Sequence, residues 1–125
     1  MADDAVTLRI PASTDRVRLA RTLVATLGDD VGFDFDEVED LRIAVDELCF
    51  VLLDLCTGDG HIDLVGRSAG STLVVEGTCS LHAASDAPPA NMSELTSQIL
   101  ATVVDDYEVG VDGSAASFRF SKTKS

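Results

Sequence analysis

The sequence is short of positive charge. Nine lysines and arginines stand against 22 aspartates and glutamates in 125 residues, which gives a formal net charge of −13. Proteins that bind nucleic acids contact the phosphates through clustered lysine and arginine side chains. The composition therefore argues against nucleic-acid binding.

Long apolar runs are also missing. The longest, residues 48–55, is interrupted by Asp54 and is far shorter than the ~18 to 20 residues that a membrane-spanning helix needs. The first ten residues, MADDAVTLRI, lack the basic and apolar regions of a secretion signal. We therefore expect a cytoplasmic protein that does not enter the membrane.

Cysteine is scarce, with Cys49, Cys56 and Cys79 alone. In a cytoplasmic protein these thiols are expected to stay reduced. Cys49 and Cys56 would lie about 10 Å apart along a predicted helix, beyond the ~7 Å reach of a disulfide. Cys79 could approach either of them. We expect three small core residues, and any redox role stays open.

What the chain does contain is apolar residues, at 46% of the total. High charge together with many apolar residues argues against disorder, and the length predicts one domain over residues 1–125. Periodicity and turn signals predict the following elements. Strands are expected at 5–10, 61–67, 72–79, 107–111 and about 116–121, and helices from Ser13 or Thr14 to a stop at Gly28, from 34–37 to about Cys56, and over about 92–104.

This order of elements predicts the fold class. Strands and helices alternate as β-α-α-β-β-α-β-β, with a loop over residues 80–90. We expect an α/β protein in which helices cover one face of a mixed sheet, as a two-layer α/β sandwich.

The negative charge is concentrated in one segment. Residues 28–60 hold eleven acids and one base, so their net charge is 1 − 11 = −10. On the second helix, a spacing of three and four residues places five side chains on one face. They are Asp40, Ala44, Glu47, Val51 and Asp54. This face is either a solvated edge or a cleft whose carboxylates could polarise water or help hold a metal.

Three segments carry a family resemblance. Residues 19–27 (LARTLVATL), 35–49 (FDEVEDLRIAVDELC) and 104–109 (VDDYEV) resemble the RsbW-type anti-sigma factors and serine kinases, including the actinobacterial UsfX kind. The resemblance covers nearly the whole chain. It implies the Bergerat-type fold of the ATPase superfamily of histidine kinases, gyrase B and MutL, here as a degenerate domain.

The second helix of that family carries the pattern Glu-x-x-x-Asn-x-x-His. The glutamate polarises a water or hydroxyl, and the asparagine holds magnesium on the ATP phosphates. In this chain the three positions are Glu47, Val51 and Asp54. The valine side chain offers no oxygen to a magnesium ion, so Glu47 is expected to be either a vestigial base or a structural acid paired with a neighbour.

The glycine motifs of the family are missing too. Its Asp-x-Gly-x-Gly element would begin at Cys79 or Asp86, and both alignments lack both glycines. Glu94 and Thr96 stand where the last glycines of the lid would fall, and no glycine occurs between Gly77 and Gly110. A loop that cradles phosphate needs unshielded backbone N–H groups. We expect neither ATP, magnesium nor another metal as a cofactor.

The first helix is the partner-binding element of the family. The resemblance implies a contact from Arg21 to a sigma factor and an anti-anti-sigma protein, although the acidic residue that accompanies this arginine in some members is Val17 here. Arg18 is a second candidate, because Arg16, Arg18 and Arg21 are a third of all basic residues and lie on one helix. These arginines serve either partner binding or solubility on an exposed face. The resemblance also implies a homodimer.

The leading interpretation is therefore a regulatory protein that sequesters a sigma factor without enzymatic activity, with its surplus acid facing solvent or a basic partner. The alternative is an active serine kinase that uses Glu47 as base and Asp54 as a metal ligand to phosphorylate the anti-anti-sigma protein.

Overall fold

The structure is a computed structural model that describes residues 5–56, 60–80 and 93–125. Asp86 and nearly all of the loop expected over 80–90 lie outside these residues. The elements are β1 (Val6–Pro11), a short 3₁₀ helix (Thr14–Arg16), α1 (Val17–Val31), α2 (Phe35–Leu55), β2 (His61–Ala69), β3 (Thr72–Ser80), α3 (Glu94–Val103), β4 (Asp106–Asp112) and β5 (Ala115–Thr123).

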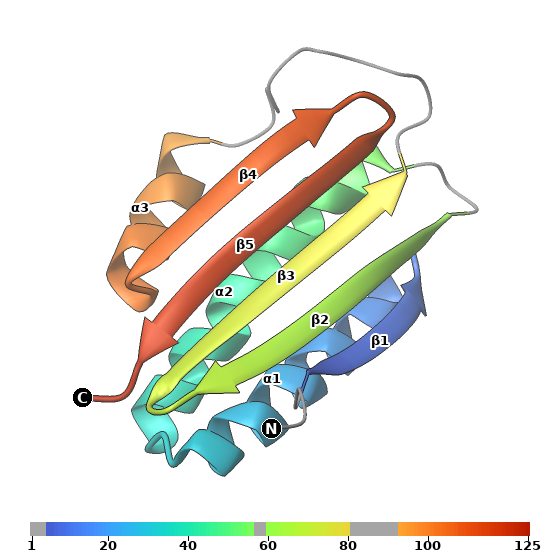
Figure 1. The fold of residues 1–125 in the computed structure, drawn as a ribbon. Coiled ribbons are helices and arrows are strands. Elements are labelled where there is room, and N and C mark those ends of the chain that lie inside the picture. Colours follow the sequence, from blue (N-terminus) through green and yellow to red (C-terminus); the bar gives the residue numbers. More distant parts are fainter. Residues whose placement is uncertain (1–4, 57–59, 81–92) are drawn as a thin grey trace.

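The five strands form one sheet in the order β1-β2-β3-β5-β4. All three helices lie against the same face of this sheet (Figure 1), which confirms the two-layer α/β sandwich. The expected mixed sheet is wrong, because each of the four pairings between described strands is antiparallel. Tight turns join β2 to β3 and β4 to β5, and such turns can connect only antiparallel neighbours.

The core lies between the sheet and the helices. Alternate strand residues point into it, and an apolar stripe of α2 packs against them from the other layer. Fully or nearly fully buried side chains include Ile62, Leu64, Leu73, Val75, Phe118 and Phe120 from the sheet and Leu41, Val45, Leu48 and Leu52 from α2. No helix in the described part of the chain is long and apolar enough to cross a bilayer.

The first helix ends one turn later than expected. It runs through Gly28 and stops at Gly32, whose φ of +98° is the left-handed conformation of a helix C-cap. Gly28 is needed for a different reason. A Cβ atom there would lie 2.8 Å from Leu41 Cδ1, so this glycine lets α1 and α2 approach closely.

The second helix begins with a capping box. Asp34 Oδ1 accepts the Glu37 N–H at 2.8 Å, and Glu37 Oε1 accepts the Asp34 N–H at 3.0 Å. These reciprocal bonds satisfy two N–H groups at the helix start. They define where α2 begins and hence which residues form each of its faces.

The cysteine expectation requires a correction. Cys56 and Cys79 form a disulfide with a Cα–Cα distance of 5.9 Å, and Cys49 is the free, buried cysteine of the described residues. Cys56 caps the end of α2, and Cys79 lies near the end of β3. Their proximity follows from the packing of α2 on the sheet, which cysteine spacing does not reveal.

Candidate functional site

The three positions that correspond to the family's Glu-x-x-x-Asn-x-x-His pattern lie along the second half of α2. Glu47 is half-buried, Val51 is 5% exposed, and Asp54 is exposed. Glu47 forms no ion pair with another described residue. The helix thus presents one carboxylate on each side of the buried Val51 side chain, and this side chain, at the position of the family's magnesium-binding asparagine, has no atom that could bind a metal.

The described residues contain no group of three or more His, Cys, Asp or Glu side chains that could hold a metal ion. Magnesium requires several oxygen ligands in near-octahedral geometry. Asp86, the other position considered for the nucleotide motif, lies outside the described residues.

The start of α3 is where the resemblance places the end of a phosphate-binding lid. Ser93 Oγ accepts the Thr96 N–H at 3.1 Å, so the chain itself caps this helix. Glu94 places a carboxylate in the first turn. A phosphate at a helix N-terminus is bound by free N–H groups and the positive end of the helix dipole. Here the Ser93 side chain already accepts the Thr96 N–H, and the Glu94 carboxylate would repel a phosphate at the same helix end.

The predicted partner-binding arginines differ in their surroundings. Arg18 is exposed, and its Nε donates to the Asp15 carbonyl at 3.2 Å. Arg21 Nη1 instead lies 2.7 Å from Asp46 Oδ1 on α2, with 39% of the Arg21 side chain exposed. The structure therefore leaves Arg18 accessible and ties Arg21 to the neighbouring helix.

This ion pair lies close to the free cysteine. Burial raises the pKa of the Cys49 thiol to about 12, the Asp46 carboxylate adds to the rise, and Arg21 opposes it. A thiol with such a pKa stays protonated near neutral pH and is a poor nucleophile. Cys49 is thus a core residue, as expected.

The acidic face of α2 has a counter-ion that the sequence analysis missed. Lys122 Nζ on β5 lies 3.3 Å from Asp40 Oδ2 and donates to the Val103 carbonyl at 2.8 Å. The lysine side chain is 12% exposed. This contact joins α2, the end of α3 and β5. The face is therefore compensated at its Asp40 end, and no metal is needed there.

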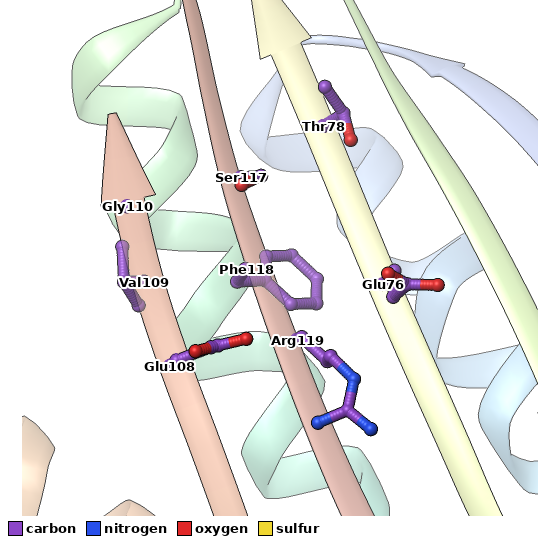
Figure 2. A pocket seen from close by; sticks show the side chains of 8 residues that line it. All are labelled: Glu76, Thr78, Glu108, Val109, Gly110, Ser117, Phe118 and Arg119. Carbon is purple, nitrogen blue, oxygen red and sulfur yellow. The ribbon is translucent and has the colours of Figure 1, made fainter. Parts of the chain in front are cut away.

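The uncovered face of the sheet carries a shallow hollow of about 290 Å³. Figure 2 shows Glu76, Arg119 and Glu108 on three neighbouring strands along it. Three ion pairs lie on this face. They are Arg9 with Asp63 at 2.7 Å, Arg67 with Glu76 at 3.1 Å and Arg119 with Asp106 at 3.8 Å. Glu108 has no ion pair among the described residues, so this face is a solvated surface on which most, but not all, charges are paired.

Comparison with known proteins agrees with the resemblance. The chain is 33% identical over 109 residues to the anti-sigma-F factor RsbW of Mycobacterium tuberculosis, in two strains. The chain is homologous to the RsbW proteins. The alignment spans 87% of this chain and 63% of that relative, less than two thirds of its length.

A shorter stretch resembles other RsbW proteins. Over 44 residues, 35% of this chain and 28% of the relative, the chain is 34% identical to the serine-protein kinase RsbW of Bacillus thuringiensis. No family profile matches the chain. The RsbW homologues thus include proteins named as anti-sigma factors and proteins named as kinases, and the residues at the site must distinguish the two activities.

Proposed function

We propose that this RsbW homologue is an anti-sigma factor-like regulatory protein that binds a sigma factor, an anti-anti-sigma protein or both. In this proposal it acts in the cytoplasm as a homodimer, and it neither binds ATP nor phosphorylates its partner.

The observation that carries the proposal is the position of Val51. A buried valine stands where the resemblance requires a magnesium-binding asparagine, so Glu47 on the preceding turn has no side-chain oxygen at position 51 beside it to help hold a metal. The capped start of α3, with the Glu94 carboxylate in its first turn, supports the same conclusion. Both elements that would hold the triphosphate are thus poorly suited to it.

Nucleotide binding is the first test. Titration of the purified chain with a fluorescent ATP analogue and magnesium is expected to show no saturable binding up to about 1 mM, a Kd equivalent to only about −4 kcal/mol. Incubation with labelled ATP and the anti-anti-sigma protein should transfer no phosphate. Micromolar binding would refute the proposed loss of ATP binding, and phosphate transfer that Glu47→Gln abolishes would establish the kinase alternative.

Partner binding is the second test. Each purified sigma factor of the source organism is titrated against the chain by calorimetry, and one of them should bind with a micromolar Kd or tighter. Arg18→Glu is expected to weaken this complex by about tenfold or more, because arginines are frequent hot spots. Lys124→Glu changes the charge equally at another exposed site and should have little effect. Absence of binding to every sigma factor and to every anti-anti-sigma protein would refute the proposed role.

A further inference from the structure

Two exposed apolar side chains meet on the helical side of the molecule. Ile43 on α2 is 41% exposed and Leu95 on α3 is 66% exposed. They line a hollow of about 330 Å³ together with Gln98, Ile99, Thr102 and Val103, which we call the α2–α3 groove. Clustered exposed apolar side chains in a folded protein mark interaction surfaces.

The apolar surface continues along α2. Phe50 follows Ile43 by seven residues, so both side chains lie on the same side of the helix. Phe50 is also 41% exposed. Alongside it, the ten residues of α3 are about 15 Å long. The surface is therefore long enough for about three turns of a partner helix.

Carboxylates border the groove. Glu39 and Glu47 lie one helical turn before and after Ile43, and Glu94 precedes Leu95. Arg42 pairs with Glu39 at 2.7 Å, whereas Glu47 has no ion-pair partner among the described residues. The apolar centre of the groove thus has an acidic rim.

The negative charge of the rim indicates which kind of segment can bind in the groove. Three arginines on the uncovered sheet face are paired with acids, whereas residues 28–60, which include α2, carry eleven acids and one base. A second copy of the chain would bring two acidic rims together, and like charges across an interface are repulsive. A segment with positive charge beside its apolar residues is complementary to the groove.

We propose that the α2–α3 groove binds a basic amphipathic helix of a protein partner. The apolar side chains of that helix enter between Ile43 and Leu95, and its lysines and arginines face Glu47 and Glu94. An amphipathic helix in a hydrophobic groove is an established mode of recognition. The inference rests on the proposed function, since it names the kind of partner segment that the binding protein would hold.

The test uses two synthetic helical peptides of about 18 residues, long enough to form several turns. Both have leucines at helical spacing, one with lysines on the flanks and the other with glutamates. Fluorescence anisotropy at about 0.15 M salt, where distant charges are screened, should show saturable one-to-one binding of the basic peptide. The acidic peptide should bind at least about tenfold more weakly.

Matched variants locate the binding. The double variant Ile43→Ser/Leu95→Ser should weaken the basic peptide by about tenfold or more. Val6→Ser removes a side chain that is equally exposed, at 41%, from β1 and should leave binding unchanged. Glu47→Gln should weaken binding and reduce its salt dependence. Circular dichroism and thermal melting verify that each variant is folded.

Three results would overturn the inference. The first is equal binding of both peptides, and the second is unchanged binding of the basic peptide to the double variant. The third is a dimer that sedimentation detects in the wild-type protein but not in the double variant, because the groove would then bind a second copy of the chain. Sigma factor binding is measured separately. If the chain binds a sigma factor but neither peptide, the groove inference is refuted and the proposed function stands. If it binds the basic peptide but no sigma factor, only the sigma factor role is refuted.

Discussion

Arg21 Nη1 on α1 lies 2.7 Å from Asp46 Oδ1 on α2. The resemblance assigns this arginine to partner contact, yet in this chain it also joins two helices. A partner carboxylate that approaches Arg21 has to compete with Asp46. Partner binding and helix packing are therefore coupled at this residue.

A charge swap separates the two roles. Arg21→Glu should lower the free energy of unfolding by about 1 kcal/mol, because the pair is partly exposed and two carboxylates then face each other. Arg21→Glu/Asp46→Arg should recover most of that loss in urea denaturation. If the α1 guanidinium contacts the sigma factor, both variants bind it weakly. Recovery of binding in the swap would show that Arg21 serves helix packing only.

Reduction of the Cys56–Cys79 disulfide should destabilise the fold. The two residues are 23 positions apart, and closing a loop of this length constrains the unfolded chain by about 3 kcal/mol. Cys56→Ser/Cys79→Ser should therefore lower the urea midpoint, and a dithiol reductant should lower the wild-type midpoint but not that of the variant. An equal response of both proteins to reductant would contradict the assignment.

Thiol labelling offers a second check on the cysteines. The Cys49 pKa is raised to about 12 by burial, so Cys49 should react with a maleimide only on unfolding. Native wild-type protein should incorporate no label before reduction. Rapid labelling of the native protein would show that Cys49 is accessible.

Glu37 should make stability depend on acid pH. The N–H groups of Asp34 and Ser125 donate to its carboxylate, which lowers the Glu37 pKa in the folded state. A lowered folded-state pKa stabilises the protein above the unfolded pKa, and this contribution is lost as pH falls through the folded value. The loss of urea stability between pH 7 and about pH 3 should be smaller in Glu37→Gln. An equal loss in both proteins would contradict this prediction.

Two glycines in the sheet should respond oppositely to alanine. A Cβ at Gly77 on β3 would contact the Phe118 ring on β5, whereas a Cβ at Gly110 would meet no atom within 4 Å. Gly77→Ala should cost about 1 to 3 kcal/mol through overpacking. Gly110→Ala should be neutral or slightly stabilising, because alanine is less flexible in the unfolded chain. Thermal melts of the two variants measure the difference, and equal midpoints would argue against the close contact.

Much of the fold was predictable because its signals are local. Alternation and helical spacing identify the strands and helices, and the expected start of α2 at residues 34–37 agrees with its N-cap at Asp34. Gly28 shows the limit of such reasoning. A glycine near a predicted helix end indicates a stop, yet this one is used for close packing against Leu41, which depends on a second helix.

The sequence by itself determined the residue types available at the site. Valine at position 51, an acid at position 94 and the absence of glycine between Gly77 and Gly110 are sequence facts, and they argue against nucleotide chemistry without any coordinates. Tertiary structure decided which residues meet. Arg21 and Asp46, Cys56 and Cys79, and Asp40 and Lys122 are 25, 23 and 82 positions apart. Their contacts, like the groove between Ile43 and Leu95, exist because helices and strands pack on a shared core, and periodicity within one element does not encode that packing.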